Sequence, residues 1–213
     1  MTMLLISLLG CNTFQDASIK LTCDEIPACS LSEASIDTDT DTATSVDVLI
    51  DFDDASISYG CAGFGGGEDC AVEADPTDST NNVLRVTKAD GAELWAGATM
   101  FTNASSLGID ALNIAKGQTS FSMRVWSPRA GIPILLKVED CSDSDRSVET
   151  LGTVTAGGAW ETVTFDFANQ TPGTEAVDYS WTYNKASIFP DFGTSGANGG
   201  GGSFYFDDFA EDF

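Results

Sequence analysis

Residues Thr119–Asp140 read TSFSMRVWSPRAGIPILLKVED, and this stretch indicates the fold most clearly. Apolar and polar side chains alternate in its first half, with Phe121, Met123 and Val125 on one side of an extended chain. The alternation resumes after a turn that contains Pro128. Two antiparallel strands with a shared apolar face are therefore predicted. Their opposite face carries an indole, a guanidinium, an ammonium and a carboxylate, which is too polar for a core and unusually aromatic for a surface.

Similar short segments recur along the chain at near-regular spacing, with Gly, Pro, Asn and Asp between them. No stretch of helical length shows a 3.6-residue period, so the expected fold is all-β: a jelly-roll sandwich of two antiparallel sheets. A short helical turn is expected within Asn103–Lys116, and an irregular loop in the glycine-rich stretch Ser56–Cys70. The strands predicted outside the first stretch are Val46–Asp54, Ala71–Ala74, Asn82–Lys88, Glu93–Phe101, Arg146–Val154, Trp160–Phe167, Tyr183–Phe189 and Ser203–Phe209.

Three regions of the chain differ in composition. Residues 1–11 (MTMLLISLLGC) resemble a bacterial lipoprotein signal, in which the chain is cut before a cysteine, here Cys11, that then carries lipid. The basic residues usual before such an apolar run are missing, so a fortuitously apolar N-terminus is the alternative. Residues 12–45 have few large apolar side chains and are expected to be a flexible linker rich in Ser, Thr and Asp. Residues 46–213 are expected to form the sandwich domain.

The six cysteines agree with export, because disulfides persist in oxidising compartments. Cys23 and Cys29 are close in sequence, as are Cys61 and Cys70, and each pair is expected to form a disulfide. This pattern leaves Cys141 unpaired, although its pairing with Cys61 or Cys70 is an alternative that the sequence leaves open. The protein is therefore expected at the cell surface or outer membrane as a lipoprotein, or outside the cell.

The charge of the chain excludes several classes of function. There are 33 acidic and 9 basic residues, and the net charge is −24. Such a surface repels nucleic acid and anionic lipid, so membrane contact is expected only through a lipid anchor at Cys11. The absence of histidine from the sequence removes histidine-based acid–base catalysis and most zinc sites. Strong acidity also keeps a protein soluble in salt, which is consistent with a marine habitat.

Several motifs together resemble the carbohydrate-binding-module-like sandwich domains, of family 4/9 type, found in secreted polysaccharide-degrading proteins of marine bacteria. The resemblance covers about Val46–Phe209 and implies a jelly roll that binds a polysaccharide without cleaving it. The sequence departs from the family pattern at Cys61, Cys70 and Cys141, and no catalytic module is attached. The motifs are Phe64-Gly65-Gly66, Asp75-Pro76, Asn82-Val83-Leu84, the segment Ala92–Gly97, RVWSP, LLKVED, the segment Tyr183–Phe189 and the segment Tyr205–Asp208.

Aromatic and charged residues at strand positions form the candidate ligand site. Flat rings stack on the C–H faces of sugars, and charged groups fix the hydroxyls, so such a mixture suits a carbohydrate. The alternative is that the indoles are core or loop-covering residues and that Arg124 pairs with Glu139 across two strands. The predicted ligand-binding residues are Trp95, Arg124, Trp126, Lys137, Glu139, Tyr183 and Lys185.

Carboxylates at both ends of the domain form a second candidate site. Asp51, Asp53 and Asp54 follow the first strand, and Asp207 and Asp208 belong to the last. Terminal strands commonly pair in sandwiches, and crowded carboxylates repel each other unless a cation such as Ca²⁺ neutralises them. The resemblance also implies a structural calcium in this region. A solvated acidic patch is the alternative.

The expected function is non-catalytic binding of a polysaccharide, and the resemblance favours a β-glucan such as laminarin. A secreted glycoside hydrolase is the expected protein partner. The alternative function is that of a structural or adhesion subunit acting through protein contacts. An enzyme is not expected, because the carboxylate pattern of sandwich glucanases is absent, and Tyr183 has no histidine partner of the kind that alginate lyases use.

Overall fold

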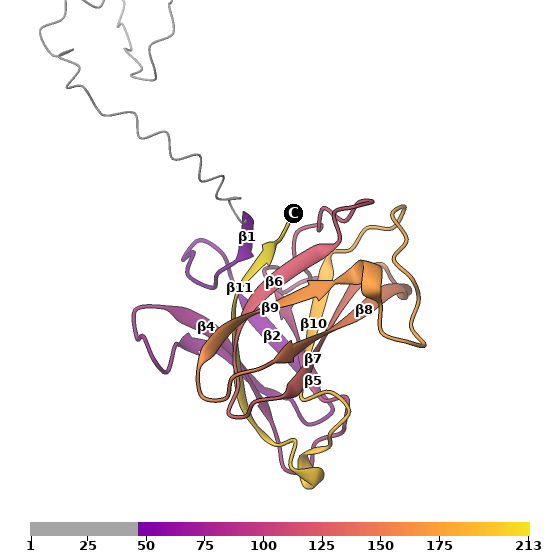
Figure 1. The fold of residues 1–213 in the computed structure, drawn as a ribbon. Helices are drawn as coiled ribbons and strands as arrows, with labels where there is room; N and C mark the ends of the chain where they lie inside the picture. Colours follow the sequence, from indigo (N-terminus) through magenta and orange to yellow (C-terminus); the bar gives the residue numbers. More distant parts are fainter. Residues whose placement is uncertain (1–46) are drawn as a thin grey trace, which may run out of the picture. The chain divides into compact units, whose positions relative to one another are not determined.

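Strands dominate the structure, a computed structural model that describes residues 47–213 (Figure 1). The predictions for Cys11, for the Cys23–Cys29 pair and for the linker lie outside the described residues. In the described part, the only helices are two 3-10 turns of three residues, and none of its helices has the length and apolar character that crossing a membrane requires. The elements are β1 (Asp47–Ile50), β2 (Gly60–Phe64), β3 (Asp69–Ala74), β4 (Asn82–Lys88), β5 (Gly97–Phe101), β6 (Ser120–Trp126), β7 (Ile132–Asp140), β8 (Asp143–Val154), β9 (Trp160–Asp166), η2 (Phe167–Asn169), β10 (Lys185–Pro190), η3 (Gly196–Asn198) and β11 (Gly202–Glu211).

Two antiparallel sheets form the predicted β-sandwich. The six-stranded sheet has the order β3-β4-β11-β6-β9, and β1 also pairs with β11. The five-stranded sheet has the order β2-β5-β10-β7-β8. The pairing of β1 with β11 confirms that the terminal strands meet: Asp47 lies opposite Glu211, and the C-terminus lies beside β1 (Figure 1). The all-β fold expected from alternation and turn spacing is confirmed.

The predicted hairpin between β6 and β7 is wrong. β6 pairs with β9 and β11, whereas β7 pairs with β8 and β10, so the two strands belong to different sheets. The turn between them, which contains Pro128 and Gly131, carries the chain from one sheet to the other. Both strands still bury their apolar residues, but these residues face each other across the core. The polar sides of the two strands consequently lie on opposite outer surfaces of the sandwich.

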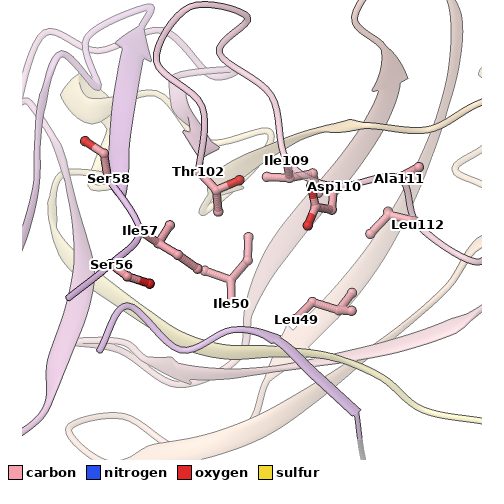
Figure 2. Close-up of a pocket in the computed structure, with 10 residues that line it drawn as sticks. All are labelled: Leu49, Ile50, Ser56, Ile57, Ser58, Thr102, Ile109, Asp110, Ala111 and Leu112. Atoms are coloured by element: carbon pink, nitrogen blue, oxygen red, sulfur yellow. The ribbon is translucent and has the colours of Figure 1, made fainter. Parts of the chain in front are cut away.

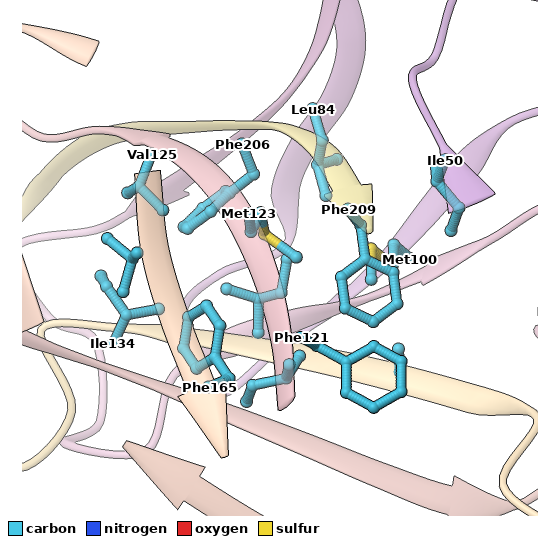
Figure 3. Close-up of a cluster of buried hydrophobic side chains, with 14 of the residues drawn as sticks. Ile50, Leu84, Met100, Phe121, Met123, Val125, Ile134, Phe165, Phe206 and Phe209 are labelled. Atoms are coloured by element: carbon cyan, nitrogen blue, oxygen red, sulfur yellow. The ribbon is translucent and has the colours of Figure 1, made fainter. Parts of the chain in front are cut away.

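The core between the sheets is rich in Phe and in branched aliphatic side chains (Figure 3). Phe121 of β6 packs against Phe209 of β11 with ring centroids 5.6 Å apart. Every second residue of a strand points into this layer, because successive side chains of a strand point to opposite faces of its sheet. The core side chains labelled in Figure 3 are Ile50, Leu84, Met100, Phe121, Met123, Val125, Ile134, Phe165, Phe206 and Phe209.

The glycine-rich stretch holds a strand that the sequence did not indicate. β2 lies at the edge of the five-stranded sheet, where Gly60 pairs with Phe101. A Cβ on Gly60 would lie 2.5 Å from the Phe101 ring, so the neighbouring ring fills the space that a side chain would take. The predicted Cys61–Cys70 disulfide is confirmed, and it joins β2 of one sheet to β3 of the other. Cys141 is therefore not bonded to either of these cysteines, and its thiol is free and exposed.

Two further local predictions differ from the structure. The segment Glu93–Ala96 was expected to begin a strand but forms a turn, in which the Ala96 N–H donates to the Glu93 carbonyl. This turn also packs against the β2–β3 loop, because the Glu93 N–H donates to the Gly65 carbonyl. The segment Asn103–Lys116 contains no helix; Asn103 and Gly108 form an isolated bridge, and Ala115 forms another with Gln118, just beyond the segment.

Candidate carbohydrate-binding face

The outer surface of the five-stranded sheet brings together three of the predicted ligand-binding residues. Lys137 and Glu139 alternate with core residues on β7, and Lys185 lies on the neighbouring strand β10. In the strand register Lys185 is directly opposite Glu139, and Ser187 is directly opposite Lys137. Residues paired in this way point to the same face of a sheet, so these four side chains form one polar row across the strands.

Ion pairs and a hydrogen bond order this polar row. The Lys137 and Lys185 ammonium groups lie 3.0 and 3.3 Å from the Glu139 carboxylate. Lys137 also lies 3.9 Å from the carboxylate of Glu149 on β8. The hydroxyl groups of Thr99 and Ser187 are 2.8 Å apart and bond to each other. Together with Glu149, the row therefore has two positive and two negative groups beside two buried hydroxyls, and the formal charge of this set is zero.

An aromatic cluster, which we define as Phe64, Trp95, Phe189 and Phe192, adjoins the polar row. Phe64 contacts Phe189 with centroids 5.2 Å apart, and Phe189 contacts Phe192 at 6.0 Å. Trp95 stacks on Phe64 with centroids 6.2 Å apart and planes 18° apart. The Trp95 side chain is 46% exposed, which leaves much of the indole open to a ligand.

The glycine-rich β2–β3 loop makes room for this indole. A Cβ on Gly65 would lie 2.7 Å from a carbon atom of the Trp95 ring, so the ring packs directly against the Gly65 backbone. Gly65 also has φ +64°, a conformation that other L-residues adopt only with strain. Gly65 is thus suited to the position by both its backbone and its missing side chain.

Arg124 and Trp126 lie on the outer surface of the other sheet, so the prediction that they share a face with Lys137 and Glu139 is wrong. Trp126 packs edge-on against Tyr205, its register partner on β11, with centroids 5.5 Å apart. The Arg124 guanidinium lies 4.8 Å from the centre of the Trp160 ring. The alternative interpretation, an ion pair between Arg124 and Glu139 across two strands, is wrong for the same reason.

The turn between β3 and β4 folds over this second surface. The Trp160 indole N–H donates to Asp75 and Thr77 in that turn, at 3.3 and 3.2 Å. Asn81, at the end of the turn, donates to the Asp207 carboxylate at 2.9 Å. The Arg124 guanidinium lies 3.2 Å from the carboxylate of Asp207 and 3.4 Å from that of Asp208. Trp160 and Arg124 are therefore held by protein groups.

Asp207 is the most strongly perturbed carboxyl on the second surface. Its side chain is 1% exposed and lies 3.2 Å from the Arg124 guanidinium. The pKa of Asp207 is raised to about 6, mainly by burial and in smaller part by the nearby Asp208 charge. Arg124 and the hydrogen bond from Asn81 favour the ionised form, but the partly exposed guanidinium is screened by water, and burial has the larger effect.

The remaining predicted ligand-binding residue, Tyr183, is a core residue. Its side chain is 1% exposed, and its hydroxyl accepts a hydrogen bond from the Asp178 N–H at 3.0 Å. Phe64, Phe189 and Phe192 are not among the ligand-binding residues predicted from the sequence. The signal that would have found Phe189 is its spacing from Lys185, since residues 185, 187 and 189 share one face of β10.

A pocket with a volume of about 490 Å³ opens at another place, between β1, the β1–β2 loop and the segment after β5 (Figure 2). Its wall is mainly aliphatic and also contains Ser and Thr hydroxyl groups and one carboxylate, that of Asp110. No aromatic residue lines it. The lining residues are Leu49, Ile50, Ser56, Ile57, Ser58, Thr102, Ile109, Asp110, Ala111 and Leu112.

The carboxylates predicted to bind calcium have protein partners in the structure. Asp51 accepts a hydrogen bond from the Tyr59 hydroxyl, and Asp53 accepts two from Asn82. Asp207 and Asp208 both face Arg124, whose guanidinium supplies the positive charge that a cation would bring. Asp207 in this arrangement does not fit a calcium ligand. Within residues 47–213, no group of three or more acidic or cysteine side chains is arranged to hold a metal ion.

Comparisons with known proteins concern the fold. No family model matches the sequence, and no curated protein matches it. Among solved structures, a family 29 carbohydrate-binding module has a TM-score of 0.45 at 12% identity and covers 78% of this chain and 86% of its own. A variant of such a module in complex with cellulohexaose has a TM-score of 0.45 at 13% identity, over 78% and 89%. The family 11 carbohydrate-binding module of a cellulosomal cellulase of Clostridium thermocellum has a TM-score of 0.43 at 14% identity, over 78% and 93%. Sequence identities this low indicate a similar fold and do not indicate a shared function.

Proposed function

We propose that the protein binds a polysaccharide, without cleaving it, on the outer face of the five-stranded sheet. The observation that carries the proposal is the continuity of the aromatic cluster with the polar row. Phe64 and Trp95 offer flat surfaces for the C–H faces of sugar rings, while the partly exposed Lys137 and Lys185, which the buried Glu139 holds in place, offer donors for hydroxyls. Five strands spaced about 4.8 Å apart give a face about 19 Å across, which suits an oligosaccharide rather than a single sugar.

The charges of this face favour a neutral glycan. Lys137 and Lys185 are already paired with Glu139, and Lys137 also faces Glu149. An anionic sugar would have to compete with these carboxylates and approach a protein of net charge −24. We therefore propose a neutral polysaccharide, and a β-glucan such as laminarin is the specific candidate.

The proposal extends to the setting in which the protein acts. The Cys61–Cys70 disulfide fits an oxidising compartment. We propose an exported protein, anchored by lipid at Cys11, that presents the sandwich to polysaccharide outside the cell and acts alongside a secreted glycoside hydrolase. Labelling of the expressed protein with radioactive palmitate, with Cys11→Ser as the control, tests the anchor.

Affinity electrophoresis in gels that contain single polysaccharides tests the binding face. We expect laminarin to retard the wild-type protein, and Trp95→Ala to abolish the retardation. Trp126→Ala, which removes an indole from the opposite sheet, is the matched control and is expected to migrate as wild type does. If no polysaccharide in a broad panel retards the wild type, the proposal fails. If only Trp126→Ala loses binding, the site lies on the six-stranded sheet instead.

Two further measurements complete the proposal. A reducing-sugar assay on the same panel is expected to show no release, since the proposed face binds and does not cleave.

We also propose a structural calcium ion bound by Asp51 and Asp53, which directly follow β1. We expect CaCl₂ to raise the melting temperature above the value in EGTA, and equal temperatures would exclude a structural calcium.

A further inference from the structure

Lys88 is a buried charged residue close to the aromatic cluster. It is the last residue of β4, and its side chain is only 1% exposed. A buried ammonium group is unfavourable unless hydrogen bonds replace its water. Burial lowers the pKa of Lys88, and the opposite charge of Asp191 partly counteracts this effect. The neighbouring Arg129 lowers the pKa of Lys88 as well.

Three backbone carbonyl groups surround the Lys88 ammonium. Its Nζ atom lies 2.9 Å from the Asp191 carbonyl oxygen, 3.1 Å from that of Pro190 and 3.4 Å from that of Leu94. An ammonium group has three donors, so these contacts use all of them. The Asp191 carboxylate bonds to Arg129 at 2.7 Å, which leaves Lys88 with carbonyls as its direct partners.

Each of these carbonyls belongs to a segment that carries part of the aromatic cluster. Leu94 immediately precedes Trp95, whereas Pro190 and Asp191 lie between Phe189 and Phe192. The two segments are far apart in sequence, and backbone bonds also join them or the residues beside them: the Gly193 N–H donates to the Leu94 carbonyl at 3.0 Å, and the Gly196 N–H donates to the Ala92 carbonyl at 2.9 Å.

The backbone at Asp191 needs this support. Its φ angle is +45°, in the left-handed region that a non-glycine residue rarely adopts. Such a conformation persists only where surrounding contacts favour it. The Lys88 and Arg129 bonds to the carbonyl and carboxylate of Asp191 are such contacts.

We propose that Lys88 is a positioning residue for the binding face: its ammonium group joins the Trp95 segment to the Phe189–Phe192 segment and so fixes the aromatic cluster before a ligand arrives. This inference rests on the proposed function for its role in binding. Preformed sites bind more tightly because less conformational entropy is lost on association. Lys88 itself touches no ligand, since it is enclosed by the two segments.

Fluorine NMR of protein labelled with 5-fluorotryptophan tests the inference in the full-length chain. The chain has four tryptophans, and their resonances are assigned with single Trp→Phe variants. We expect Lys88→Met to shift or broaden the Trp95 resonance and to leave those of Trp126, Trp160 and Trp181 in place. Lys116→Met, which removes an exposed lysine, is the control and is expected to change none of the four.

The same variants are then titrated with laminarin. We expect Lys88→Met to bind about tenfold more weakly than the wild type and Lys116→Met to bind equally well. If Lys88→Met folds and its Trp95 resonance matches the wild type, the inference is overturned. If the wild type binds no polysaccharide, the proposed function fails, while the Trp95 resonance still decides whether Lys88 holds the cluster.

A measurement on the wild type covers the case in which Lys88→Met does not fold. In ¹⁵N-labelled and ¹³C-labelled protein, the Lys88 ammonium should give a slowly exchanging signal with couplings across hydrogen bonds to the carbonyl carbons of Leu94, Pro190 and Asp191. Observation of these couplings supports the positioning role. A rapidly exchanging Lys88 ammonium without them overturns it.

Discussion

Lys185 and Glu139 face each other across β10 and β7, with their charged atoms 3.3 Å apart on the outer face of the five-stranded sheet. Glu139 holds Lys137 at 3.0 Å as well, so one carboxylate orients both ammonium groups. The Glu139 side chain is buried by these contacts, whereas the lysines remain partly exposed. Glu139 is therefore the residue on which the order of the polar row depends.

Glu139→Gln should weaken binding more than it weakens the fold. The amide keeps the shape of the side chain but removes the charge that holds both lysines, which can turn toward water. We expect a loss of about 1 kcal/mol in the free energy of unfolding and about tenfold lower affinity for laminarin. Urea denaturation and calorimetric titration measure the two effects, with Glu93→Gln, an exposed residue outside the row, as the control. Unchanged affinity would show that the ligand does not use this row.

Gly65→Ala should displace the Trp95 ring. The new methyl group would lie 2.7 Å from the ring, and the positive φ adds a backbone penalty of about 1 kcal/mol. Gly117→Ala has a similar φ of +84° but no heavy atom within 4 Å of the new Cβ, so it isolates the backbone penalty. We expect Gly65→Ala to lose more stability than Gly117→Ala, because only Gly65→Ala adds a close contact to the backbone penalty, and we expect only Gly65→Ala to lose affinity for laminarin. If Gly65→Ala and Gly117→Ala bind laminarin equally well, the position of the Trp95 ring does not affect binding.

Removal of the Cys61–Cys70 disulfide should destabilise the sandwich without changing its topology. The bond closes a loop with a sequence separation of 9 and joins the edge strands of the two sheets. Loop closure of this size contributes about 2–3 kcal/mol. We expect that loss in the Cys61→Ser/Cys70→Ser double variant, measured by urea denaturation with Cys141→Ser in both proteins to remove the free thiol. A change below about 0.5 kcal/mol would contradict the entropic estimate.

Asp207 should make the protein less stable as the pH rises from about 4 to about 6. Its pKa in the folded protein is about 6, above its usual value of about 3.9 in an unfolded chain. The folded state therefore binds the extra proton in this window, and the stability that protonation provides is present below pH 4 and lost as the pH passes 6. We expect the stability difference between wild type and Asp207→Asn to change by about 1–3 kcal/mol in this interval and to be constant above pH 7. A constant difference throughout would contradict the raised pKa.

The strands and their buried sides were predictable, because apolar and polar residues alternate along each segment. The partners of each strand were not predictable in the same way. Trp126 and Lys137 are only eleven positions apart, and the same alternation is compatible with one shared face or with two opposite faces. The turn after Trp126 leads into the other sheet, and only contacts distant in sequence determine that route.

The aromatic cluster also depends on distant contacts. Phe189 and Phe64 come from opposite parts of the chain and meet through the order β2-β5-β10. Gly65 contributes by leaving room for the Trp95 ring, and Lys88 contributes by donating to carbonyls of both segments; neither contact can be read from the residue type. The outward direction of Lys137, Glu139 and Lys185 was predictable, because alternation places them away from the core. Trp95 lies in a turn, where alternation does not indicate the direction of a side chain.

The direction of β11 determines where a surface or a fusion partner can be attached without covering the aromatic cluster. Its Glu211 end pairs with Asp47, while its Gly202 end pairs with Lys88, beside the segments that carry the aromatic cluster (Figure 1). Ten residues of strand separate these two ends by about 30 Å. A fluorescent reporter or a second domain can be fused before Asp47 or after Phe213, and a sensor chip can be attached there. These positions lie at the end of the sandwich away from the aromatic cluster, so Trp95 would remain accessible.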